Sequence, residues 1–218
     1  MTAPEIQSLT GFVMPVGNGA VGKTSVSRVL DAISRGREHN GEIIKDIRKT
    51  NNLEFEYITT RQKFGSTTYS VTLQFLVPPG QKETEGDLTG RSFEKVIAIY
   101  RSLIRRLDVV LFTYDVGSHE SFQDLAYWVD GVGSLMNDNT HFILLGTHLD
   151  CKDEIEVTKE EIKNGLDYLR KEILIMRPSW QGKCTDLEIS SLSGENLPVL
   201  LRYLAGSVVM SHRMSETR

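Results

Sequence analysis

The sequence predicts an α/β protein in which a six-stranded, mostly parallel sheet has helices on both faces. Short apolar runs alternate with segments of helical period along the chain, a pattern typical of a sheet covered by helices. The string Gly-x-x-x-x-Gly-Lys-Thr at 17–24 stands between an apolar run and a helical pattern, which is the context of a phosphate-binding loop. With 218 residues, 39% of them apolar and 25% charged, we expect one domain over residues 1–218.

The elements are expected in the order β-α-β-β-α-β-α-β-α-β-α. Short apolar runs predict the strands Phe12–Val16, Val71–Val77, Val109–Tyr114, Phe142–Leu145 and Leu187–Ile189, and the segment around Arg61–Phe64 is expected as a further strand that pairs with Val71–Val77. This pair is expected to be connected by a turn at Gly65-Ser66. Apolar residues spaced i, i+3, i+4 and i+7 predict helices over Val26–Ile33, Phe93–Leu107, Phe122–Val129, Ile162–Ile173 and Leu197–Val208.

Polar residues mark where two of these helices begin. Ser118 precedes the helix that carries Phe122 and is expected to cap it. Thr158 and Glu161 have the spacing of a capping box before the helix that carries Ile162. The first helix is expected to end near Gly36.

The loop that follows the first strand is the candidate phosphate site. Its glycines let successive N–H groups point into one concavity, and the next helix adds the positive end of its dipole. Lys23 is expected to reach the β- and γ-phosphates, and the Thr24 hydroxyl to bind Mg²⁺. The candidate binding residues here are Gly17, Asn18, Gly19, Ala20, Val21, Gly22, Lys23, Thr24 and Ser25.

Charge and composition exclude several classes of partner. A net charge of −4 lacks the basic surplus expected for binding nucleic acid or an anionic membrane. No apolar run approaches the ~20 residues that span a bilayer, Thr2 stands where myristoylation needs glycine, and the last four residues contain no cysteine for prenylation. Cys151 and Cys184 make no disulfide framework. We expect a cytoplasmic protein without a stable membrane anchor, whose partners are a nucleotide and a protein.

Further motifs follow the later strands. Thr147-His148-Leu149-Asp150 follows the fifth strand, Glu188-Ile189-Ser190-Ser191-Leu192 follows the sixth, and Asp115 with Ser118 and Phe122 follows the fourth. Together with the order of elements, they resemble a small GTPase of the Ras superfamily over roughly residues 8–210, with the Rho-like form of the guanine motif, in which Thr comes first.

The resemblance implies that GTP and GDP bind together with Mg²⁺. Asp150 would accept hydrogen bonds from guanine N1–H and the 2-amino group, which adenine does not offer. The His148 imidazole would stack on the base, and backbone N–H groups of the last loop would contact guanine O6. The implied contacts with the base are Thr147, His148, Asp150, Ser190, Ser191 and Leu192.

The two switch segments depart from the family pattern. The first, about residues 37–60, is enlarged, and Thr59 is the candidate threonine for Mg²⁺ beside Thr24 because Phe64 follows it by five residues. Thr60 is a nearly equal candidate. Alternatively, both threonines belong simply to an edge strand.

The second switch, about residues 77–92, is also enlarged and reads Val77-Pro78-Pro79-Gly80-Gln81, with valine where the family has an acidic Mg²⁺ partner. This form resembles prokaryotic Ras-like GTPases. It implies that the Gly80 N–H binds the γ-phosphate and that Gln81 orients the attacking water, unless Gln81 is only a solvated loop residue.

The expected function is a guanine-nucleotide-dependent switch, an enzyme that hydrolyses GTP slowly and controls a protein partner. Gln81 and Lys23 are the candidate catalytic residues. An arginine that completes the site would come from Arg48, Arg61 or Arg91, or from an activator protein.

The resemblance also implies an effector or activator that contacts the switches, and a roadblock-type partner or a homodimer. One alternative is a pseudo-GTPase scaffold with little turnover, to which Val77 and His148 point. Another is an ATP-dependent enzyme, which Asp150 disfavours.

Overall fold

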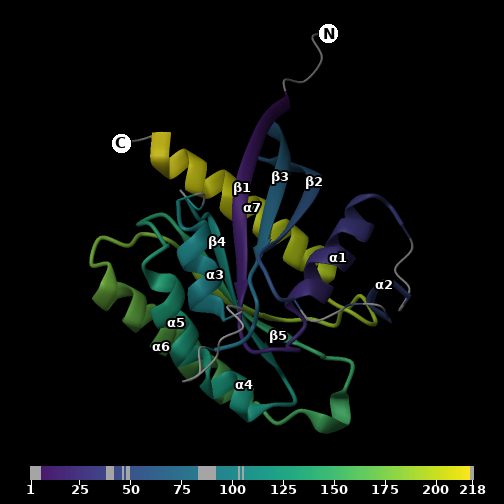
Figure 1. Cartoon of the computed structure of the whole chain (residues 1–218). Coiled ribbons are helices and arrows are strands. Elements are labelled where there is room, and N and C mark those ends of the chain that lie inside the picture. Colours follow the sequence, from purple (N-terminus) through teal and green to yellow (C-terminus); the bar gives the residue numbers. More distant parts are fainter. Residues whose placement is uncertain are drawn as a thin grey trace.

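The protein contains one mixed six-stranded sheet with the strand order β2-β3-β1-β4-β5-β6. The computed structural model of the chain describes residues 6–37, 42–45, 47, 50–82, 92–102, 104 and 106–216. The strands are β1 (Ile6–Val16), β2 (Glu54–Phe64), β3 (Thr67–Val77), β4 (Val109–Asp115), β5 (His141–Thr147) and β6 (Cys184–Glu188). Only β2 is antiparallel to its neighbour, so the predicted mostly parallel sheet is confirmed (Figure 1).

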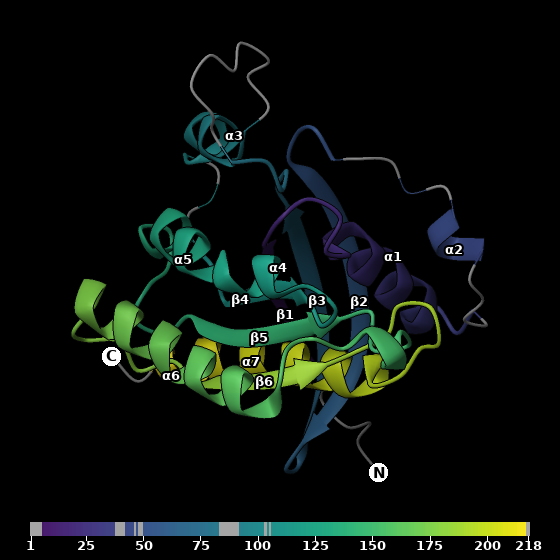
Figure 2. The same cartoon turned by 90° about the horizontal axis from the view of Figure 1, so that it is seen from below.

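Helices cover both faces of this sheet. They are α1 (Lys23–Ser34), α2 (Glu42–Lys45), α3 (Phe93–Tyr100), α4 (His119–Gln123), α5 (Leu125–Gly133), α6 (Lys159–Met176) and α7 (Leu197–Glu216), with a 3₁₀ turn at Lys152–Glu154. One apolar core lies between the sheet and α1 and α7, and the other between the sheet and α3, α5 and α6. Figure 2 shows α3, α5 and α6 on the opposite side from α1.

Alternation along the central strands divides their side chains between the two cores. Val13 belongs to the core under α1 and α7, and Met14 to the other; Val109 and Val110 divide in the same way. Successive side chains of a strand point to opposite faces, so a strand covered on both faces is apolar throughout. This is why the central strands appear in the sequence as continuous apolar runs.

Several boundaries differ from those expected. The expected β2 began at Arg61, whereas the strand begins at Glu54 and pairs with β3 along its whole length. The helix expected over 93–107 ends at Tyr100, and the helix expected after Ser118 is divided at Asp124 into α4 and α5. A short helix, α2, lies in the segment expected to be a loop.

Both predicted helix caps are confirmed. The Ser118 side chain accepts a hydrogen bond from the Ser121 N–H at 3.2 Å. Thr158 and Glu161 form the reciprocal capping box at the start of α6, with the Glu161 N–H donating to Thr158 Oγ1 at 3.3 Å and the Thr158 N–H to Glu161 Oε2 at 2.8 Å.

The topology gathers the candidate site at one edge of the sheet. The strands β1, β4, β5 and β6 are parallel, so their carboxyl ends meet at the same edge, where open α/β sheets bind ligands. The motifs around Lys23, Asp115, Asp150 and Ser190 follow these four strands, and the second switch follows β3, which is parallel to β1. Within the described residues, no helix has the length and apolar composition needed to cross a membrane.

Candidate nucleotide-binding site

The loop from Gly17 to Gly22 connects the end of β1 to the start of α1. Gly17 and Gly22 have positive φ angles of 147° and 86°. A Cβ atom at Gly17 would lie 2.1 Å from the carbonyl O of Thr113 in β4, so this position requires glycine. Because α1 begins at Lys23, its first N–H groups, which have no partner within the helix, face the loop. The backbone therefore has the arrangement in which phosphate groups bind.

Lys23 is buried beneath this loop. Its Nζ donates to the carbonyl oxygens of Gly17 and Asn18, each at 2.7 Å. Burial lowers the pKa of the Lys23 ammonium to about 7, because a charge removed from water loses its hydration. An anion in the loop would favour the charged form of this amine and raise its pKa again.

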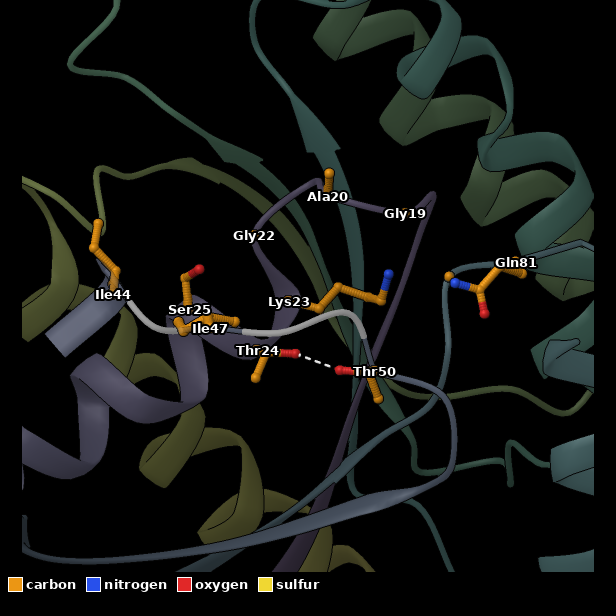
Figure 3. A pocket seen from close by; sticks show the side chains of 11 residues that line it. Gly19, Ala20, Gly22, Lys23, Thr24, Ser25, Ile44, Ile47, Thr50 and Gln81 are labelled. Atoms are coloured by element: carbon orange, nitrogen blue, oxygen red, sulfur yellow. Dashed lines mark hydrogen bonds between the residues drawn. The ribbon is translucent and has the colours of Figure 1, made fainter. Parts of the chain in front are cut away.

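A second threonine lies beside Thr24. Thr50 Oγ1 is 2.8 Å from Thr24 Oγ1, and both side chains are buried. Figure 3 shows the two hydroxyl groups facing each other. Paired hydroxyl oxygens are suitable ligands for a hard cation such as Mg²⁺, which therefore fits this donor set. Among the described residues, no group of three or more His, Cys, Asp or Glu side chains is placed to hold a metal.

The expectation that Thr59 is the second metal-binding threonine is corrected by this arrangement. Thr59 lies within β2, where its hydroxyl is 3.1 Å from that of Thr72 on β3. The end of β2 nearest the candidate site is Glu54, which pairs with Val77 just before Gly80 and Gln81. Thr59 is five residues farther along the extended strand, roughly 16 Å from Glu54. Thr60 lies one residue farther still, so neither candidate reaches Thr24.

The reasoning from sequence missed Thr50 because it relied on the distance to Phe64. That residue ends β2 at the far tip of the β2–β3 hairpin, so its spacing carries no information about the site. The usable signal was the alternation of charged and apolar residues over 54–57, which indicates a strand that begins four residues after Thr50. Arg61 lies in the same far half of β2. Arg48 and Arg91, the other candidate arginines, are outside the described residues.

The segment after β3 closes one side of the site. A Cβ atom at Gly80 would lie 2.4 Å from Lys23 Nζ and 2.5 Å from the carbonyl O of Asn18, so the backbone here packs directly against the phosphate loop. The Gln81 carbonyl accepts a hydrogen bond from the Phe93 N–H at 2.9 Å, at the start of α3. Gly80 thus lies against Lys23, and Gln81 lines the same cavity.

These residues surround one cavity of about 530 Å³. The predicted residues in its wall are Gly19, Ala20, Gly22, Lys23, Thr24, Ser25, Gly80 and Gln81. Three others were not predicted: Thr50, Ile47, and Ile44 of α2. Figure 3 shows Gln81 beyond Lys23, on the opposite side of the cavity from Ser25 and Ile44.

The motif after β5 is held against the phosphate loop. The buried Thr147 Oγ1 lies 2.9 Å from the carbonyl oxygens of both Val21 and Tyr114. Its hydroxyl therefore connects β5, β4 and the phosphate loop. His148 has a positive φ of 61°, and its Nδ1 is 2.7 Å from Asp115 Oδ2, so the imidazole is held by the last residue of β4.

Asp150 lies next to the loop after β6. The Ser190 hydroxyl donates to Asp150 Oδ1 at 2.5 Å. Ser190 Oγ in turn accepts hydrogen bonds from the N–H groups of Leu192 at 3.1 Å and Ser193 at 2.9 Å. The two segments predicted to read a base, 147–150 and 190–192, are thus joined through Ser190, although 40 residues separate Asp150 from Ser190.

The fold and the site, a six-stranded, mostly parallel sheet with a glycine-rich loop between β1 and α1, are consistent with a Ras-like small G domain. Comparison with known protein families supports this likeness over part of the chain: residues 89–173 match the model of the Ras family. That segment extends from before α3 into α6 and includes Asp150; the phosphate loop precedes it.

Individual relatives match over a similar length. Human Ras-related protein Rab-44 is 36% identical over 67 residues, which are 31% of this chain and 7% of the human protein. Ras-related protein RabQ of Dictyostelium discoideum is 34% identical over 68 residues, 31% of this chain and 33% of RabQ. Human Rab-12 is 25% identical over 68 residues, 31% of this chain and 28% of that protein. The chain thus matches a third or less of the length of each of these relatives.

Proposed function

We propose that this chain is a small GTPase of the Ras superfamily, a switch that binds GTP and GDP and hydrolyses GTP slowly. The observation that carries the proposal is the meeting of Lys23, Thr24, Thr50, Gly80 and Gln81 around one cavity at the end of β1. These residues come from three separate segments of the chain and supply a cation, two hydroxyls, a backbone N–H and an amide. That is the set of groups by which a site binds and cleaves a nucleoside triphosphate.

In this proposal, Lys23 neutralises charge on the β- and γ-phosphates, and the Gly80 N–H binds the γ-phosphate. Thr24 and Thr50, in place of Thr59, hold Mg²⁺ through their hydroxyl oxygens. The ion, when bound, neutralises the charge that develops on the phosphate oxygens. Gln81 orients the water that attacks the γ-phosphate.

Guanine specificity is assigned to Asp150. Its Oδ1 already accepts from Ser190, and its remaining lone pairs can accept from the N1–H and 2-amino group of guanine. Adenine has neither donor at these positions and would leave these lone pairs of the carboxylate without a partner in the site, at a cost of about 1–3 kcal/mol. His148, held by Asp115, is proposed to contact the base.

A second candidate function is a pseudo-GTPase scaffold, which Val77 favours. Val77 is fully buried in the core under α1 and α7, so the position where the family has an acidic metal partner is an apolar packing position here. An aspartate introduced at 77 would place a charge in this core, and it would reduce stability before it improved metal binding. Weak Mg²⁺ affinity and fast nucleotide release are therefore expected in either case.

The proposed partner is an effector or activator protein that contacts the switches. Phe55 and Tyr57 on β2 and Ile99 on α3 are exposed apolar residues near them, and such residues commonly mark contact surfaces. The form of the second switch supports assignment to the prokaryotic Ras-like type, and with it a roadblock-type partner or a homodimer.

The proposal is tested first by identifying the nucleotide released when the purified protein is denatured, followed by incubation with GTP and Mg²⁺. Bound guanine nucleotide with slow GDP formation is the expected result. Guanine nucleotide without turnover would favour the scaffold, whereas adenine nucleotide would contradict the role of Asp150.

A matched pair of variants tests the threonine assignment. Thr50→Ala is expected to weaken the Mg²⁺ dependence of GTP binding, while Thr59→Ala leaves it unchanged. The opposite result would restore Thr59 as the switch threonine.

A further inference from the structure

Asp124, between α4 and α5, connects the phosphate loop to the segment that carries Gln81. Its Oδ2 accepts a hydrogen bond from Asn18 Nδ2 at 2.6 Å and lies 2.5 Å from Lys82 Nζ. Asn18 directly precedes Gly19 of the phosphate loop, and Lys82 directly follows Gln81. One carboxylate oxygen therefore sets the separation between these two segments.

Two aromatic residues of α5 fix the groups that Asp124 joins. The indole Nε1 of the buried Trp128 donates to Asn18 Oδ1 at 2.8 Å, so both ends of the Asn18 amide are held. Lys82 Nζ lies 5.1 Å from the centroid of the Tyr127 ring, a distance at which a cation is attracted to an aromatic face. The Asn18 and Lys82 side chains are thus held from two directions each.

The carboxylate of Asp124 bonds to Asn18 and Lys82 and does not cap its own helix. Asp124 occupies the N-cap position of α5, where aspartate usually accepts a hydrogen bond from an N–H of the first turn, yet it makes no side-chain cap bond. Burial acts to raise the pKa of Asp124, but the hydrogen bonds from Lys82 and Asn18 outweigh it and lower the pKa. The carboxylate is ionised at neutral pH, which strengthens both bonds.

The segment around Gln81 is consequently held on both sides of that residue. On one side, the Gly80 backbone packs against Lys23 and the Asn18 carbonyl. On the other, Lys82 is bonded to Asp124. Because the backbone is restrained on both sides of Gln81, the Gln81 amide can reach only a limited range of positions. The rate of a reaction depends strongly on how a catalytic group is oriented toward the reacting atoms.

We propose that Asp124 and Lys82 form a latch that positions Gln81 over the phosphate loop, so that they are positioning residues for GTP hydrolysis and not for GDP binding. This inference rests on the proposed function, because it assigns the latch to the hydrolytic step. Neither side chain belongs to the set assigned to phosphate, Mg²⁺ or the base, which is why nucleotide affinity should not depend on the pair.

Lys82→Met tests the latch directly because it leaves Asp124, Asn18 and Trp128 in contact. Lys63→Met, at an exposed position near the far tip of the β2–β3 hairpin, is the matched control. We expect Lys82→Met to lower the single-turnover rate of GTP hydrolysis about tenfold or more while the affinity for GDP stays unchanged. A normal rate in Lys82→Met would overturn the proposal.

A double-mutant cycle assigns the effect to the pair. Asp124→Asn keeps the shape of the side chain but removes its charge, which weakens the bonds to both Asn18 and Lys82. The double variant with Lys82→Met should therefore be no slower than Asp124→Asn alone, since that variant has already lost the ion pair with Lys82. If the fold-reduction in the double variant equals the product of the two single fold-reductions, the two residues act independently, and the latch is contradicted.

Amide hydrogen exchange separates failure of the latch from failure of the proposed function. In the protein without added nucleotide, we expect Lys82→Met to speed exchange at Gly80, Gln81 and Phe93 relative to Lys63→Met, since the Phe93 N–H is bonded to the Gln81 carbonyl. Unchanged exchange would overturn the latch, whatever the protein hydrolyses. Faster exchange in a protein that turns over no GTP would support the latch as a structural contact and would overturn its role in hydrolysis together with the proposed function.

Discussion

Replacing Lys23 by methionine removes a buried amine whose protonation opposes folding when no nucleotide is bound. Burial lowers its pKa from 10.5 in the unfolded chain to about 7 in the folded protein. Between pH 7 and 10.5, the unfolded chain therefore binds the proton more strongly than the folded protein does. Stability then rises with pH across this window and is lost as the pH falls toward 7. Each pKa unit corresponds to ~1.4 kcal/mol, so the whole window contributes up to about 4–5 kcal/mol.

The experiment is urea unfolding of the nucleotide-free protein at pH 7, 8 and 9, with Lys23→Met measured in parallel. The bonds to the Gly17 and Asn18 carbonyls favour the charged amine and act against burial. We therefore expect the free energy of unfolding of the unsubstituted protein to rise by about 1 kcal/mol per pH unit relative to the variant. Lys63→Met, which removes an exposed amine, should follow the unsubstituted protein.

Parallel stability curves for the unsubstituted protein and Lys23→Met between pH 7 and 9 would refute this reasoning, because they would show that the folded state does not disfavour the charged amine. Saturating GDP and Mg²⁺ give a second readout. If phosphate binds as proposed, it favours the charged lysine, and the rise in stability with pH should flatten.

Two further predictions concern the fold that supports the site. Gly17→Ala is expected to destabilise the protein by about 2–4 kcal/mol, because the new Cβ would lie 2.1 Å from the Thr113 carbonyl O. The control in thermal unfolding is Gly36→Ala, which also has a positive φ but open space around it, so it shares the backbone strain without the clash. Equal losses in the two variants would contradict the steric argument. Burial lowers the pKa of His141 to about 4, so the unfolded chain binds its proton more strongly and stability should rise by about 2 kcal/mol from pH 5 to 7. Comparison of urea unfolding at these two pH values with His141→Gln checks this, and an equal pH dependence in the variant would exclude His141 as the cause.

The local parts of the fold and site were predictable from short stretches of sequence. Short apolar runs located most of the strands, since burial on both faces makes a strand apolar throughout. Helical spacing located the covering helices, since burial on one face imposes a period on the chain. The Thr158 cap and the glycines at 17 and 22 were predictable because capping and positive φ depend on a few adjacent residues. Contacts within the loop itself, such as Lys23 with the Gly17 and Asn18 carbonyls, lie within six residues of sequence.

The second threonine and the support of the site were not predictable in this way. Thr50 meets Thr24 only because the β2–β3 hairpin turns its Glu54 end toward the phosphate loop, and spacing along the strand pointed to Thr59 instead. Asp124 has no local signature of a bridge, because its position between two helical turns suggests an ordinary cap. Nothing in its neighbours indicates that Asn18, 106 residues away, is its partner.

The sequence by itself therefore determined the α/β class, the phosphate loop with Lys23 and Thr24, and the motif that contains Asp150, because each depends on a short pattern whose physical cause is local. Only the tertiary structure decided which hydroxyl lies beside Thr24, that Thr147 connects β5 to the loop, and that Asp124 joins Asn18 to Lys82. These contacts depend on the order and direction in which strands pair, and pairing partners far apart in the chain leave no periodic trace in the residues between them.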